Sequence, residues 1–173
     1  AAIRDLNRKL DFRKAIKHAI DGKAIAKAMS KGPFAHVYAG GIALDSAFFD
    51  ADATAFWPYD PSASNALLDG LGLVDTDGNS VRNFPNGGGD LVISLVQSRD
   101  SENEQLIGDG LATMMAEVGI KVNLKVMEET EPVRQSGEFD WLIRRAEQEF
   151  AFPFTSFWTR LGPVDNQNFP SHL

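Results

Sequence analysis

The chain has 173 residues, 43% of them hydrophobic, and it carries a net charge of −7 with no cysteine. This length and composition allow one compact domain with a real core, and the lack of cysteine excludes disulfides, thiolate metal sites and thiol catalysis. The acidic balance argues against nucleic acid or an anionic membrane surface as a partner, because both favour a basic protein surface.

No segment of the sequence has the pattern of a membrane span or an export signal. No apolar run approaches the roughly 20 residues that are needed to cross a bilayer. Residues Ala1 to Asp5 are not followed by the apolar stretch of a signal peptide. We therefore expect that, if the protein is exported, this chain is a mature piece of it.

The first predicted elements are two helices within residues 12–29. One face of the first helix is apolar, and basic residues occupy the other; the apolar residues are Phe12, Ala15, Ile16, Ala19 and Ile20. Asp21 and Gly22 interrupt the pattern, and Asp21 is a good cap for a second short helix over 23–29. Residues 33–58 then show no steady period. Their aromatic side chains indicate a packed segment or a functional loop rather than disorder.

The stretch from Tyr59 to Gly78 combines a helix start, a helix stop and a turn. Asp60 can accept hydrogen bonds from the free N–H groups of a helix start, and Pro61 suits the first helical position. We expect a helix over 62–70, ended by Gly72 and followed by a tight Asp-Thr-Asp-Gly turn. The inward face of this helix is predicted to carry Ala63, Ala66, Leu67 and Leu71.

The second half of the chain predicts a strand–helix–strand unit. Residues 87–89 are three glycines and predict a flexible joint before the apolar strand 91–96. A helix over 104–118 follows, with Gly119 as its terminator and with Ile107, Leu111, Met114, Met115 and Val118 facing inward. Residues 120–126 alternate between apolar and polar, which is typical of a half-buried strand. The two strands should be parallel with a right-handed crossover.

The remaining residues predict a connection, a third strand and an aromatic segment. Residues 128–137 are polar and indicate a connection or a short helix, and 139–144 form the third predicted strand. After Glu149 the sequence is aromatic and turn-rich. No internal repeat and no low-complexity tract occurs in the sequence.

Catalytic and metal-binding signatures are poor. The three histidines, His18, His36 and His172, are far apart in sequence, and His18 is more simply a solvated or packed residue than a ligand. The sequence contains no nucleophile elbow, no zinc-protease helix and no Walker loop. Residues 75–79 faintly resemble a calcium loop, but the glycine comes too early and no glutamate closes it. We therefore expect no catalytic residue, no metal and no cofactor.

The most interesting polar cluster follows the third predicted strand. Ligands of open α/β sheets bind beyond the carboxyl ends of the strands, and several chemically active residues fall there: Arg144, Arg145, Glu147, Glu149, Phe150 and Trp158. A carboxylate beside aromatic rings can bind an ammonium group, and guanidinium groups can bind a carboxylate or phosphate. The alternative is an ordinary surface ion pair beside core aromatics.

The order of these motifs resembles the bacterial extracellular solute-binding proteins of family 5, the oligopeptide- and dipeptide-binding receptors of ATP-binding-cassette (ABC) importers. The resemblance rests on the double helix at 11–25, the Tyr59–Gly78 block, the strand at 91–96, the segment 117–122 and Phe139-Asp140-Trp141. It implies an α/β fold: a periplasmic-binding-protein type II-like lobe with a mixed sheet, a βαβ unit and flanking helices. Residues 1–173 would form a single domain, most of the second, C-terminal lobe, with the first lobe absent.

The resemblance also implies where the ligand binds. In many peptide-binding members the third strand is followed by a loop whose acidic residue receives the α-ammonium group of the peptide. Glu149 stands at that acidic position, whereas Ala146 replaces a family tryptophan and Phe152 replaces a second acid. Other branches carry oligosaccharides, nickel chelates, opines or modified peptides, and Arg144 and Arg145 would suit an anionic ligand.

We expect a periplasmic solute receptor that binds a peptide, opine or sugar-like solute between two lobes and delivers it to ABC permease subunits. We expect no nucleic acid as a partner and no catalysis, because no bond of the solute is broken. Two other readings stay open. One is a carboxylate-based glycoside hydrolase using Glu147 or Glu149, which requires two carboxylates about 5–9 Å apart across a cleft. The other is a small protein-interaction domain whose exposed surface is the aromatic segment 150–158.

Overall fold

The computed structural model describes residues 2–30, 50, 52 and 57–143. Its elements in chain order are the helices α1 (Ala2–Arg8), α2 (Leu10–Ala19), α3 (Gly22–Ser30) and α4 (Pro61–Gly70), a 3₁₀ turn (Pro85–Gly87), strand β1 (Val92–Ser98), helix α5 (Glu102–Glu117), strand β2 (Lys121–Met127), helix α6 (Glu131–Ser136) and strand β3 (Trp141–Leu142). None of the described helices is long and apolar enough to cross a membrane.

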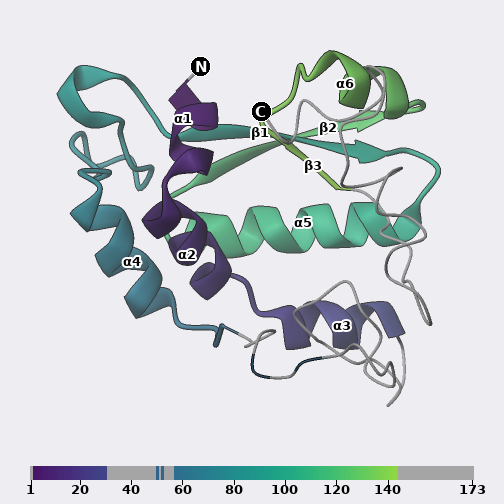
Figure 1. Ribbon diagram of the computed structural model, residues 1–173, viewed down its shortest axis with the longest axis horizontal. Helices are drawn as coiled ribbons and strands as arrows, with labels where there is room; N and C mark the ends of the chain where they lie inside the picture. The colour runs from purple at the N-terminus through teal and green to yellow at the C-terminus, as the bar shows by residue number, and fades with distance from the viewer. Residues whose placement is uncertain (1, 31–49, 51, 53–56, 144–173) are drawn as a thin grey trace.

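The described strands form one parallel sheet in the order β2-β1-β3, with α5 running along one of its faces (Figure 1). β1 pairs with β2 over seven residues, from Val92 opposite Lys121 to Ser98 opposite Met127. The predicted strand–helix–strand unit with parallel strands is therefore confirmed. Antiparallel pairing among the described residues is confined to isolated bridges that join Asn83 to Val74 and to Asp90.

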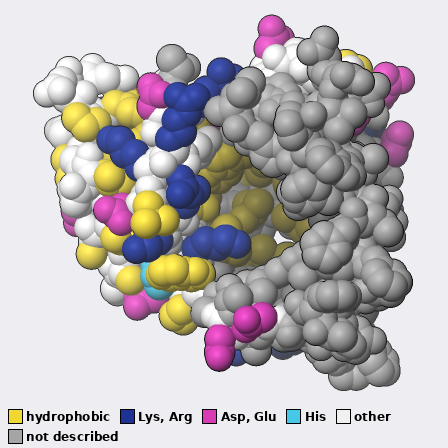
Figure 2. All heavy atoms as spheres, in the orientation of Figure 1, with side chains coloured by type: hydrophobic (Ala, Val, Ile, Leu, Met, Phe, Trp, Pro, Cys, Tyr) yellow, Lys and Arg dark blue, Asp and Glu magenta, His cyan; other side chains and the backbone are white. Residues whose placement is uncertain are grey.

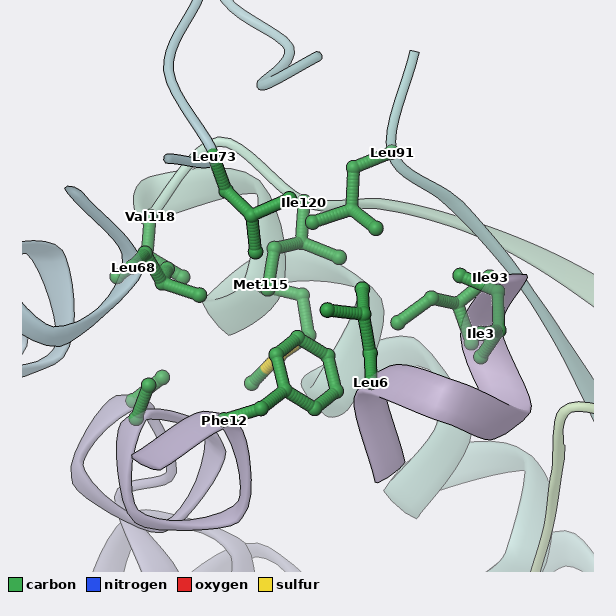
Figure 3. Close-up of a cluster of buried hydrophobic side chains, with 12 residues drawn as sticks. Ile3, Leu6, Phe12, Leu68, Leu73, Leu91, Ile93, Met115, Val118 and Ile120 are labelled. Carbon is green, nitrogen blue, oxygen red and sulfur yellow. The ribbon is translucent and has the colours of Figure 1, made fainter. Parts of the chain in front are cut away.

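The core lies between the sheet and the helices, and every layer contributes to it (Figure 3). Its residues from the first and second helices include Leu6 and Phe12, strand β1 supplies Ile93, and Leu91 lies directly before that strand. Met115 from α5 and Leu68 from α4 complete this core. Each of these six residues has at most 6% of its surface exposed. Because Leu6 and Met115 lie 109 positions apart in sequence, the helices and the sheet depend on one another for burial of apolar surface.

The predicted helices near the N-terminus are confirmed, including the break between them. Ile20 has extended backbone angles, and the Asp21 carboxylate accepts a hydrogen bond from the N–H of Ala24 at 3.0 Å. The sequence reading missed α1, which is only seven residues long and so too short for a helical period to be read. Its burial comes from two residues, Ile3 and Leu6.

Helix α4 begins and ends as predicted, but its inward face is rotated. The Asp60 carboxylate accepts from the N–H of Ala63 at 2.9 Å, and Gly72 follows the last turn with φ +75°. The N–H of Leu73 donates to the carbonyl of Leu68 at 3.1 Å, which is a Schellman ending. The fully buried residues are Ser64 and Leu68, whereas Ala66, predicted to face inward, is exposed.

Helix α5 ends in the same way, as expected from Gly119. This glycine has φ +77°, and the N–H of Ile120 donates to the carbonyl of Met115 at 2.9 Å. Met115 and Ile120 are both fully buried, so the hydrogen bond closes over an apolar contact.

One arginine, Arg82, joins the ends of both helices. It is 9% exposed, and its guanidinium donates to the carbonyl of Val118 at 2.7 Å and to the carbonyl of Leu73. The same group donates to Asp69 at 2.6 Å and to the amide oxygen of Asn65 at 2.7 Å. A cation at a helix C-terminus satisfies free carbonyl groups and opposes the helix dipole, and here one side chain serves two helices.

Residues 87–89, predicted to be a flexible joint, lie in a hydrogen-bonded turn. The N–H of Phe84 donates to the carbonyl of Gly89 at 2.8 Å, and Gly87 and Gly89 have φ +76° and +80°. At least two of these glycines supply backbone angles that a tight turn requires, and their flexibility stays a prediction.

Strand β1 packs very closely against α5 at one position. An ideal Cβ placed on Gly108 would lie 1.7 Å from Oε1 of Gln97, and Gln97 is only 2% exposed. Gly108 is thus the residue of α5 that makes room for a buried amide of the central strand.

The charge of the described chain is unevenly distributed. Residues 2–30 hold eight Lys and Arg but only three Asp, although the whole chain has net charge −7. Figure 2 shows Lys and Arg side chains gathered over α1 and α2, beside a hollow lined by hydrophobic side chains. The net charge therefore does not describe this face of the molecule.

Candidate functional site

The candidate site is the edge of the sheet where the three described strands end. In a parallel sheet all strands finish at the same edge, and ligands of open α/β sheets bind beyond it. β1 finishes at Ser98, β2 at Met127 and β3 at Leu142. Helix α5 starts at this edge and runs back along the sheet (Figure 1).

The connection from β1 to α5 is held by its own side chains. Ser101 caps the helix by accepting from the N–H of Glu104 at 3.3 Å, in a Ser-x-x-Glu pattern. The Glu104 carboxylate accepts from the N–H of Ser98 at 2.8 Å, and the amide of Gln105 donates to the carbonyl of Arg99 at 2.6 Å. The backbone at the end of the central strand is therefore fixed without any ligand.

Two charged side chains extend from this edge into solvent. Arg99 and Glu128 form an ion pair across the ends of β1 and β2, and their side chains are 58% and 73% exposed. The N–H of Arg99 also donates to the carbonyl of Met127 at 2.7 Å, which extends the ladder by one bond. An exposed ion pair adds little to stability, but its donors and acceptors remain accessible to polar groups of a ligand.

The third strand brings the chain to the same edge. Leu95 and Val96 of β1 pair with Trp141 and Leu142, and the N–H of Ile143 donates to the carbonyl of Val96 at 2.9 Å. The predicted strand over 139–144 is shorter in the structure, because Asp140 takes part through its side chain rather than through the ladder. Its carboxylate accepts from the N–H of Ser94 at 2.9 Å.

The predicted ligand residues lie outside the described residues. They are Arg144, Arg145, Glu147, Glu149, Phe150 and Trp158, and the described chain ends at Ile143, immediately before them. The residues at the edge that sequence reasoning did not select are Arg99 and Gln105. Their signal was available in the polar stretch that directly follows a buried strand.

The only histidine within the described residues, His18, is packed on the surface. Its Nδ1 lies 2.9 Å from the carbonyl oxygen of Pro58, and its ring meets Trp57 edge-on at 5.4 Å. The ammonium group of Lys14 lies 5.6 Å from the centre of the Trp57 ring. Among residues 2–30, 50, 52 and 57–143, no three His, Cys, Asp or Glu side chains are grouped so that they could hold a metal ion.

The acidic turn after α4 uses its carboxylates to organise the backbone. Asp75 accepts from the N–H groups of Gly78 at 2.8 Å and Ser80 at 2.9 Å, and Asp77 accepts from Asn79 at 3.2 Å. Partial desolvation raises the pKa of Asp75, but the N–H groups of Gly78, Ser80 and Asp77 outweigh it and hold the pKa below its usual value. The turn has the structural role that its sequence predicts.

Comparison with known protein sequences gives two findings. A family model described as "Bacterial extracellular solute-binding proteins, family 5 Middle" matches residues 4–168. The periplasmic alpha-galactoside-binding protein of Rhizobium meliloti (strain 1021) is 38% identical over 155 residues, which are 87% of this chain and 22% of that protein. The chain thus spans about a fifth of the length of this relative.

Solved structures agree with the sequence matches. The periplasmic binding protein MelB of Agrobacterium fabrum C58, in complex with stachyose, superposes with a TM-score of 0.79 and 36% identity over 83% of this chain and 22% of that chain. The oligopeptide-binding protein AppA of Bacillus subtilis, in complex with a nonapeptide, has a TM-score of 0.69 and 18% identity over 81% of this chain and 28% of that chain. The second likeness concerns the fold alone.

Proposed function

Because the chain belongs to the bacterial extracellular solute-binding proteins of family 5, we propose that it is most of one lobe of an ABC importer's extracytoplasmic receptor, and that the receptor binds an oligosaccharide containing α-galactoside. Its α/β fold with a parallel sheet is that of periplasmic binding proteins of type II. One observation carries the choice of ligand. The two relatives at 36% and 38% identity are a stachyose complex and an α-galactoside-binding protein, whereas the peptide complex of AppA is only 18% identical.

The ligand class proposed here differs from the peptide that the family resemblance favours. Oligosaccharides present hydroxyl groups and apolar ring faces, and a site for them needs planar polar side chains beside aromatic rings. Arg99, Glu128 and Gln105 supply such polar groups at the described edge. Beyond residue 143, the sequence adds Arg144, Arg145, Glu147, Glu149, Phe150 and Trp158 as proposed ligand contacts.

We propose that binding proceeds by closure of two lobes over the ligand, which stabilises the closed form that a permease recognises. This chain would then supply only one side of the site. We expect the isolated 173-residue chain to bind weakly, because half of the contacts are absent. Calorimetry on the isolated chain that gave sub-micromolar affinity would contradict this two-sided site.

The full-length protein tests the ligand class directly. Isothermal titration with stachyose, raffinose and a mixture of oligopeptides should give tight binding of the galactosides and none of the peptides. Tight binding of peptides alone would refute the proposal. Chromatography of stachyose after incubation with the protein should recover it intact, whereas release of galactose would support the alternative of a glycoside hydrolase.

A further inference from the structure

Strand β3 is too short to define its own position in the sheet. Only two of its residues, Trp141 and Leu142, pair with β1, and within the described sheet it lies at an edge. A shift of one residue would move each side chain to the opposite face of the sheet. Something other than the ladder must therefore select the register.

The carboxylate of Asp140 supplies that selection. Backbone N–H groups along a strand alternate between its two neighbours, so the N–H of Ser94 points to the same side as the backbone of Val96, which pairs with β3. The β3 ladder begins opposite Leu95, and the N–H of Ser94 would have no backbone carbonyl to meet. Oδ2 of Asp140 accepts from it at 2.9 Å, and both residues are half-buried.

Helix α1 holds the same strand from a second direction. The indole N–H of Trp141 donates to the side-chain oxygen of Asn7 at 3.2 Å. The guanidinium of Arg4 donates to the carbonyl of Gly137, just before the strand, at 3.4 Å. The Arg4–Gly137 and Asn7–Trp141 contacts span 133 and 134 positions of sequence. Both contacts form together with the Asp140 contact in one register of β3.

We propose that Asp140 is a positioning residue for the ligand site: by fixing β3 on β1, it sets where the chain leaves the sheet edge after Ile143. This inference rests on the proposed function, because the residues proposed to contact the oligosaccharide follow Ile143 directly. The carboxylate of Asp140 is engaged by the N–H of Ser94, so we assign it no contact with the ligand. It acts through the register of the strand that carries the chain to the site.

The test compares three variants of the full-length protein. Asp140→Ala removes the acceptor, Asp140→Asn keeps an oxygen that can accept from Ser94, and Asp60→Ala is the control. Asp60 caps α4 and makes a bond to Ala63 of the same kind, a carboxylate oxygen accepting from a backbone N–H at 2.9 Å. Its loss should lower stability by a similar amount without changing β3. Stachyose affinity is measured by calorimetry, and hydrogen exchange is measured at the amides of Ser94 and Ile143.

Asp140→Ala should weaken stachyose binding by about tenfold or more and accelerate exchange at both amides. Asp140→Asn should restore affinity to within about threefold, and Asp60→Ala should leave affinity and both amides unchanged. Parental affinity in Asp140→Ala would overturn the inference, and so would equal losses of affinity in Asp140→Ala and Asp60→Ala. Failure of the parental protein to bind stachyose would refute the proposed ligand class instead, and the exchange rates would still decide whether Asp140 anchors the strand.

Discussion

The close approach of Gly108 to Gln97 predicts that Gly108→Ala destabilises the chain, whereas helix propensity alone predicts that it stabilises it. Gly108 lies inside α5, where alanine ordinarily stabilises a helix by about 1 kcal/mol relative to glycine. Here the new Cβ would lie 1.7 Å from Oε1 and 2.9 Å from Cδ of Gln97. The amide of Gln97 is buried, so it must move within a packed core to make room.

The expected cost follows from these two opposing effects. Forcing extra volume into a packed core costs about 1–3 kcal/mol, and a 1.7 Å approach belongs at the upper end of that range. After the gain in helix propensity, Gly108→Ala should destabilise the chain by about 1–2 kcal/mol net. For a domain of this size, that lowers the melting temperature by roughly 2–8 °C.

Urea unfolding measures the effect, and Gly110→Ala is its matched control in the same helix. A Cβ on Gly110 would meet nothing nearer than Cγ1 of Ile25, at 3.8 Å, so this variant should be stabilised by about 0.5–1 kcal/mol. In a Gln97→Ala background the clash is absent, and Gly108→Ala should become stabilising as well. If Gly108→Ala stabilises the chain as much as Gly110→Ala does, the close approach to Gln97 is wrong.

Three further outcomes follow from the described contacts. Arg82→Met leaves the carbonyl groups of two helix ends without their donor and should lower the free energy of unfolding in urea by about 3–5 kcal/mol. Arg99→Met breaks only an exposed ion pair and should lower it by less than about 1 kcal/mol. Equal losses in the two variants would contradict this contrast. Ser64→Ala should stabilise by about 0.5–1 kcal/mol, because the hydroxyl of Ser64 is buried without a hydrogen-bond partner in the part of the chain that the structure describes, and a loss of stability would show that it has one. Asp75 has a lowered pKa, so its charged form adds stability above its unfolded pKa of about 3.9, and this contribution is lost as the pH falls through the folded value. Asp75→Asn should therefore be less stable than the parental chain in urea at pH 7, with a difference that closes below about pH 4; a difference independent of pH would refute the role of the charge.

The elements that could be predicted from sequence are those whose ends are fixed by local chemistry. Asp60 and Asp21 cap their helices through a carboxylate three residues from the N–H that it accepts, and this spacing can be read directly. Gly72 and Gly119 end α4 and α5 because each adopts a positive φ that other residues resist. The parallel strands followed from their apolar pattern and from the helix between them.

Features that depend on distant residues were missed or misplaced. The inward face of α4 turns toward Ser64 and Leu68, although the apolar residues of the helix alone favoured a face that included Ala66. The third strand is short because the side chain of Asp140, and not its backbone, bonds to β1. Asp140 accepts from the N–H of Ser94, which lies 46 positions earlier in the sequence. Sequence periodicity carries no information about such a contact.

For the candidate site, the location could be predicted from sequence, whereas the roles of its residues could not be tested. Its location at the carboxyl edge of the sheet followed from the order of strands, because parallel strands end together. The residues predicted to contact ligand, from Arg144 to Trp158, lie beyond the described residues, and their roles stay predictions. Arg99 was not selected, although it stands in the polar stretch that directly follows a buried strand, where ligand-binding residues of such sheets can be sought.

The contact between α1 and β3 also affects how the protein is made. Asn7 and Trp141 are 134 positions apart, and at about 5–20 residues per second a ribosome needs roughly 7–27 seconds to pass from one to the other. During that interval α1 lacks the strand that it contacts through Asn7. The packing of α1 against β3 therefore forms only after both segments have been made, and until then the surface of α1 that contacts β3 is open to non-native contacts.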